Sequence, residues 1–233
     1  RLYSHLNAEN VAFNFINYNY TYTLDKCLNV IKNIPGLLGS HTFGGNQYRN
    51  HVGTICHVHG TIDGQMVFGV NDESQIAKLD VFDGDDGDLC KKFLIKKETN
   101  DSQGENVDLT AKKILQESSI IYIYGMALGI TDKLWWSRIC TWLQENSTHH
   151  LIIHKHGMPA RGVFQVMNQL AERQEKRDFM ILGDCPQERW QSIENQIHVT
   201  GYNIFSDISE IARPLEFIES KTDIEDRQLA SIL

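Results

Sequence analysis

The fold is decided by Ser119-Ile120-Ile121-Tyr122-Ile123-Tyr124 and by the segment that follows it, Gly125-Met126-Ala127-Leu128-Gly129-Ile130-Thr131-Asp132. The first segment is a short continuous run of Ile and Tyr, which predicts a buried strand. Beyond the second segment, apolar residues recur at helical spacing: Leu134, Trp135, Ile139, Trp142 and Leu143. A strand, a glycine turn and a helix in this order are typical of a parallel α/β sheet.

The segments on either side repeat this alternation of strand and helix. We expect strands over residues 11–16, 52–58, 151–153 and 179–182, and helices over 23–34, 89–95, 108–117 and 163–173. The helix from residue 23 would be capped by Thr21 or Thr23. Residues 66–69 are predicted to close a hairpin onto the strand over 52–58, and the glycine-rich residues 36–50 are predicted to be a loop.

Composition narrows the class of protein. The chain has 233 residues, is 41% hydrophobic and 22% charged, and carries a net charge of −8. It is long enough to bury a core, and its acidity disfavours direct binding of nucleic acid. Five scattered cysteines without a CxxC pair, and the absence of an apolar run of roughly 18 residues, lead us to expect a cytoplasmic protein with no membrane association.

Polar motifs follow three of the expected strands. Asn19-Tyr20-Thr21 follows the first, His57-Val58-His59-Gly60 ends the second, and Gly125 to Asp132 follows the third. Parallel sheets bind ligands where their strands end, so the set predicts a nucleotide pocket. Each motif also has a structural interpretation, because Asn caps helices, Asp132 suits the first turn of a helix, and glycines permit tight packing.

The two histidines admit a second interpretation. His57 and His59 lie two apart on an expected strand, so their side chains would share one face and could bind zinc together with Cys56, or with His154 and His156. No second ligand pair stands at the usual spacing, so we predict no metal site. A third function, that of a metal-dependent nuclease, would depend on the acidic loop over residues 80–88.

Four motifs in order resemble the AbiH abortive-infection family. They are residues 15–25, His57-Val58-His59-Gly60, Val67-Phe68-Gly69-Val70-Asn71-Asp72, and residues 121–132. The resemblance spans roughly residues 11–151. Asp25 stands where the family usually has Glu. The family in turn resembles the sirtuin-like superfamily, which implies a Rossmann-type, mainly parallel sheet with helices on both faces.

The resemblance also implies roles for individual residues. Asn19 would position water or the ribose, and His59 would be the catalytic histidine. The remaining nucleotide contacts would come from Tyr20, Thr21, Gly60, Gly125, Met126, Ala127 and Asp132. Ala127 replaces a serine that is often found there. Because no glycine-rich phosphate turn is present, we expect the first strand and that turn to precede Arg1 in a longer protein.

These expectations define a domain over residues 1–204, followed by a helical tail or the start of another region over 205–233. We expect an antiphage effector that hydrolyses NAD, its substrate, at the nicotinamide–ribose bond. The alternative is a non-catalytic nucleotide-binding module that regulates a defence complex. Control would come from homo-oligomer assembly or a partner protein, and Trp136, which lies off the apolar stripe of its helix, is a candidate contact.

Overall fold

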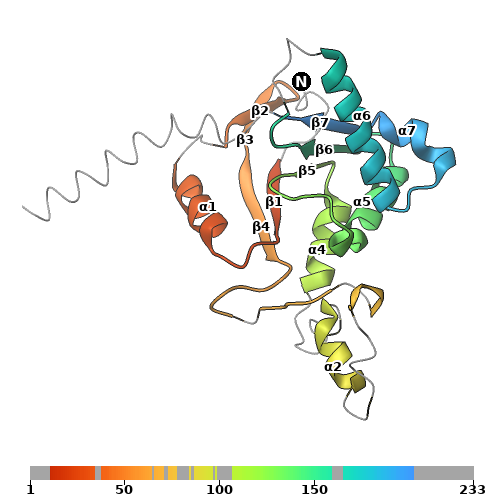
Figure 1. The fold of residues 1–233 in the computed structure, drawn as a ribbon. Coiled ribbons are helices and arrows are strands. Elements are labelled where there is room, and N and C mark those ends of the chain that lie inside the picture. The colour runs from red at the N-terminus through yellow and green to blue at the C-terminus, as the bar shows by residue number, and fades with distance from the viewer. Residues whose placement is uncertain are drawn as a thin grey trace, which may run out of the picture.

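The computed structural model describes residues 11–34, 38–64, 66–70, 73–77, 84, 87–96, 98, 107–158 and 165–201. Figure 1 shows the arrangement of the helices and strands. The strands are β1 (Ala12–Asn17), β2 (Ser40–Phe43), β3 (Asn46–Arg49), β4 (His51–His57), β5 (Ile120–Ile123), β6 (His150–His154) and β7 (Ile197–Thr200). The α-helices are α1 (Thr23–Asn33), α2 (Gly87–Leu94), α4 (Val107–Glu117), α5 (Lys133–Glu145), α6 (Gln165–Leu182) and α7 (Trp190–Glu194). Short 3₁₀ helices lie at Glu73–Gln75, Ile130–Asp132 and Gln187–Arg189.

Parallel strand pairing dominates the described residues. β1 pairs in parallel with β4, and a second parallel sheet has the order β5-β6-β7. Helices α1 and α4 pack against the β1–β4 pair and lie on opposite sides of it (Figure 1). The register of β1 and β4 places Asn17 opposite His57. The expected α/β class with parallel sheets is confirmed.

One hydrophobic cluster joins the two parallel sheets. It contains the apolar faces of β5, β6 and β7, residues from α4, α5, α6 and α7, and Cys56 and Val58 at the end of β4. Trp136 is 1% exposed and its indole N–H donates to the Gly129 carbonyl at 2.8 Å. The prediction that Trp136 faces a second protomer is therefore wrong, because the residue is a core side chain.

The expected strand over residues 179–182 is also wrong. These residues are the last turn of α6, which continues until Gly183 because no proline or glycine interrupts it. Phe179 and Met180 are buried while Ile181 is 55% exposed, a pattern that a helix produces and an alternating strand does not. The next strand after β6 is instead β7, which the sequence analysis did not predict.

Two further local expectations need correction. Residues 36–50 were expected to be a loop, yet β2 and β3 form an antiparallel hairpin there, because Gly44 and Gly45 both have positive φ and turn the chain tightly. No strand forms over the described residues of 66–69. That segment meets the end of β4 through a single bond from the Val67 N–H to the His59 carbonyl, 2.9 Å long.

Helix α1 begins at Thr23, and its N-cap is Tyr22 without a side-chain capping bond. The capping role expected of Thr21 or Thr23 is therefore wrong. Most of the acidic loop over 80–88 and all of the proposed tail over 205–233 lie outside the described residues. Within the part of the chain that the structure describes, no helix combines the length and apolar character that crossing a membrane requires.

Candidate functional site

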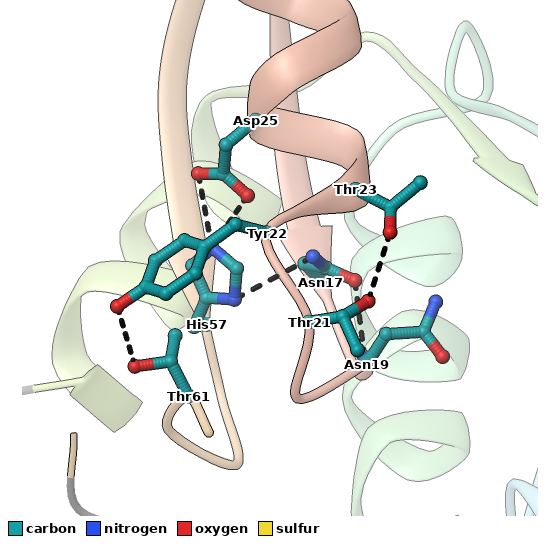
Figure 2. A network of polar contacts seen from close by, with 8 residues as sticks. All are labelled: Asn17, Asn19, Thr21, Tyr22, Thr23, Asp25, His57 and Thr61. Atoms are coloured by element: carbon teal, nitrogen blue, oxygen red, sulfur yellow. Dashed lines mark hydrogen bonds and ion pairs between the residues drawn. The ribbon is translucent and has the colours of Figure 1, made fainter. Parts of the chain in front are cut away.

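Three neighbouring elements build the first part of the site: the end of β1, the start of α1 and the end of β4. Figure 2 shows His57 between Asn17 and Asp25. His57 Nε2 lies 3.1 and 3.0 Å from the two carboxylate oxygens of Asp25, and His57 Nδ1 lies 3.5 Å from Asn17 Nδ2. Tyr22 adds a hydroxyl contact to Thr61 at 2.8 Å. These contacts connect the first turn of α1 to the end of β4.

The contacts of Asn17 define the hydrogen position on His57. The Asn19 backbone N–H donates to Asn17 Oδ1 at 3.0 Å, so the amide nitrogen of Asn17 faces the imidazole. That amide nitrogen donates, so His57 Nδ1 accepts and His57 Nε2 carries the hydrogen that Asp25 receives. Both nitrogens of His57 are occupied, which makes this histidine a structural bridge rather than a free base.

Cys56 is a buried core residue that contacts helix α4. Its Sγ donates weakly to the Val107 carbonyl at 3.6 Å on the α4 side. Burial and the neighbouring Asp108 carboxylate raise the pKa of the Cys56 thiol to about 11. Cys56 is therefore a protonated thiol packed in the core. No group of three or more potential ligands gathers among the described residues.

The second part of the site surrounds His59. β4 ends at His57, so His59 lies in the following turn, and the two histidines contact different groups instead of sharing a strand face. The ring of His59 is flanked by Tyr18, with centroids 5.3 Å apart, and by Tyr20, with centroids 6.1 Å apart. Lys96 Nζ lies 3.4 Å from His59 Nε2 and 3.9 Å from Asp132 Oδ1. We call His59, Lys96 and Asp132 the polar cluster.

Burial controls the charge states around His59. Burial first, and then the Lys96 ammonium, lower the pKa of His59, while Asp132 and the Val58 backbone act in the opposite direction. The imidazole is therefore uncharged at neutral pH. Burial, reinforced by the Asp132 carboxylate, raises the pKa values of Tyr18 and Tyr20, so both hydroxyls keep their protons.

Two atoms of the polar cluster have unmet hydrogen-bonding capacity. His59 Nδ1 and Asp132 Oδ1 are both buried, and neither has a hydrogen-bond partner among the described residues. A buried polar atom without a partner costs about 1–3 kcal/mol, so native proteins rarely keep one without a reason. Unsatisfied atoms at the carboxyl ends of parallel strands are typical of a site that receives a ligand.

The structure brings only some of the predicted residues together. His59, Tyr20 and Asp132 meet around the polar cluster. Asn19 is exposed and its amide points away from His57 in Figure 2, and Thr21 is exposed and contacts Thr23. Gly60 lies in the turn after His59, with φ +71°. On the segment leading from β5 toward Asp132, Met126 packs on the core, whereas Gly125 and Ala127 are exposed.

Lys96 and Asn17 are members of the site that the sequence motifs do not indicate. Lys96 belongs to a Lys-Lys-Glu run, which reads as a solvated surface, and its approach to His59 depends on a pairing between residues 70 and 95 that no local pattern predicts. Asn17 lies within the motif over residues 15–25, but no role was expected of it. A signal existed for it, because Asn17 is the last residue of a strand whose other members are largely apolar.

Comparison with known proteins identifies the family. A family model described as bacteriophage abortive infection AbiH matches residues 3–154, about two thirds of the chain, including both histidines and Asp132. No curated protein and no solved structure matches the chain. The family's description places its members in abortive-infection defence against bacteriophages. The chain belongs to the AbiH family of bacteriophage abortive-infection proteins.

Proposed function

We propose that this AbiH protein acts in defence by hydrolysing NAD at the nicotinamide–ribose bond. The observation that carries the proposal is the polar cluster, with its two buried and unsatisfied atoms, His59 Nδ1 and Asp132 Oδ1. The cluster follows the carboxyl ends of β4 and β5, the position at which parallel sheets hold nucleotides. The resemblance to sirtuin-like proteins supplies NAD as the substrate.

The chemistry of this reaction matches what the cluster offers. Cleavage of the bond develops positive charge on the ribose, so the site must position one nucleophile and limit the access of other water. An uncharged imidazole and a carboxylate together supply a donor and an acceptor that can hold a hydroxyl group or a water molecule. Tyr18 and Tyr20 shield the His59 ring from bulk solvent. Asn19 would meet the substrate from the solvent side.

The test is nicotinamide release from NAD by the full chain. We expect release by the wild type, loss of at least ten-fold in His59→Gln, and a smaller loss in Asn19→Ala because its amide is exposed. His198→Gln is the matched control, since His198 lies on β7 and contacts His150 instead of the polar cluster. Equal rates in His59→Gln and His198→Gln would remove His59 from the reaction.

A second candidate function is a nucleotide-binding module that regulates a defence complex without cleaving its ligand. The observation that favours it is the burial of His59, whose exposure of 8% leaves little of the ring available to a substrate. Calorimetric titration with NAD distinguishes the two functions. Binding without nicotinamide release over hours, by a folded protein, would support the regulatory module and reject the hydrolase.

We also propose that the protein is controlled through assembly of copies of the chain or through a partner protein. The same titration, repeated with and without the partner protein and at several concentrations of the chain, would reveal such control as a change in the affinity for NAD.

A further inference from the structure

Lys96 is held in place by its own backbone. The Lys96 N–H donates to the Val70 carbonyl at 2.9 Å, and the Val70 N–H donates to the Leu94 carbonyl at 2.8 Å. Residues 70 and 95 form an isolated parallel bridge just after α2. The side chain of Lys96 is only 15% exposed and reaches both His59 and Asp132. A lysine fixed at both its backbone and its charged end is an ordered part of the polar cluster.

We propose that Lys96 is a positioning residue that holds the His59 imidazole in the tautomer with its hydrogen on Nδ1. An ammonium group has three donors and no acceptor, so the 3.4 Å contact requires His59 Nε2 to accept. The single hydrogen of the uncharged ring is then on Nδ1. Asp132 supports this arrangement because its carboxylate pairs with the same ammonium group at 3.9 Å.

This tautomer assigns opposite hydrogen-bonding roles to the two unsatisfied atoms. His59 Nδ1–H is a buried donor and Asp132 Oδ1 is a buried acceptor, and neither makes a hydrogen bond within normal distance among the described residues. The Lys96 ammonium pairs with Asp132 Oδ1 only at 3.9 Å, and the Val58 backbone lies beside the His59 ring. In the reaction proposed above, on which this step rests, His59 would donate to an oxygen of the substrate or water. Proton acceptance would then fall to Asp132 and not to His59.

The charges around His59 determine how the ring responds to a loss of Lys96. The titratable groups that face the ring are Lys96, Asp132, Tyr18 and Tyr20, and the two tyrosines stay uncharged. Replacing Lys96 with an uncharged residue removes a cation that opposes protonation of His59 and leaves the Asp132 carboxylate unopposed. The pKa of His59 therefore rises when this lysine is lost.

The tautomer is measured directly by nitrogen NMR of the imidazoles in the full chain, with the His59 signals assigned from their absence in His59→Gln. We expect Nδ1 to carry the hydrogen in the wild type and in Lys96→Arg, because a guanidinium also only donates. In Lys96→Met we expect the hydrogen to move toward Nε2 and the His59 titration to shift to higher pH. The control is Lys91→Met, since Lys91 is 17% exposed and pairs with Glu73 and Asp88 instead.

An Nε2–H tautomer in the wild type would overturn the proposal, and so would an unchanged tautomer in Lys96→Met. Lys96→Arg separates a lost contact from a disturbed fold, because it retains the charge and the donors. The nitrogen signals report on Lys96 whether or not the protein cleaves NAD. Failure of the nicotinamide assay with an Nδ1–H ring would therefore reject the hydrolase and leave the role of Lys96 intact.

Discussion

The pairing of Asp25 with His57 can be tested by a double-mutant cycle. Asp25→Ala, His57→Ala and the double variant together isolate the interaction between the side chains, because the cost of each truncation cancels. Both carboxylate oxygens approach Nε2, at 3.1 and 3.0 Å, and the side chains of His57 and Asp25 are 15% and 24% exposed. The pair is therefore screened less than a surface contact but is not fully buried.

The expected coupling energy follows from that intermediate burial. Exposed pairs contribute about 0.2–1 kcal/mol, and hydrogen bonds to charged groups contribute about 1.5–3 kcal/mol. We expect about 1–2 kcal/mol for Asp25 and His57 from urea unfolding at neutral pH, with a Tm shift of about 2–4 °C for each kcal/mol. The control cycle uses Lys113 and Glu117 on α4, which are 73% and 63% exposed and should couple by about 0.3–0.5 kcal/mol. A coupling for Asp25 and His57 no larger than this control would refute the bridging role of His57.

Two further predictions concern glycines and pH. Gly69→Ala should lower the free energy of unfolding far more than Gly125→Ala in urea titrations. A Cβ added at Gly69 would lie 2.1 Å from the Leu94 carbonyl oxygen. A Cβ added at Gly125 would meet open space, so only the φ of +69° at that residue opposes the substitution. Similar losses in the two variants would contradict this reasoning. Burial and Lys96 lower the pKa of His59 in the folded chain below the unfolded value of about 6.5, so this histidine's contribution to stability is present above that pH and is lost as pH falls through the folded pKa. The stability of His59→Gln should therefore fall less steeply than that of the wild type between pH 7 and 5. Parallel stability curves for the two proteins would count against this prediction.

Local patterns predicted the elements that carry strong periodicity. The runs that became β1, β4, β5 and β6 are apolar enough to mark strands, and α1, α4 and α5 have clear helical spacing. The run Phe179–Leu182 was misread because four apolar residues fit a strand or a helix turn equally well. β7 was missed because only two of its four residues, Ile197 and Val199, are aliphatic. The hairpin of β2 and β3 was predictable, since Gly44-Gly45 is a recognised turn pair.

The site was predictable only in part, because some of its members meet through tertiary contacts that no local pattern indicates. His59, Tyr20 and Asp132 each follow an expected strand, and their position at strand ends indicated that they would gather. Lys96 joins them through the bridge between residues 70 and 95, which is a tertiary contact without a local signature. The orientation of Asn19 was not predictable either, because the Asx turn that Asn17 forms with its backbone turns the Asn19 amide toward solvent.

The sheet β5-β6-β7 extends beyond the segment that defines the family. The family match ends at residue 154, the last residue of β6, yet β6 is the central strand and β7 forms its outer edge. Phe179 and Ile197, both beyond the match, are fully buried. A fragment cut at residue 154 would expose the apolar face of β6 and its row of backbone donors and acceptors, which invites self-association. Chimeras between relatives should therefore place their junction beyond β7, so that β6 keeps the strand with which it pairs.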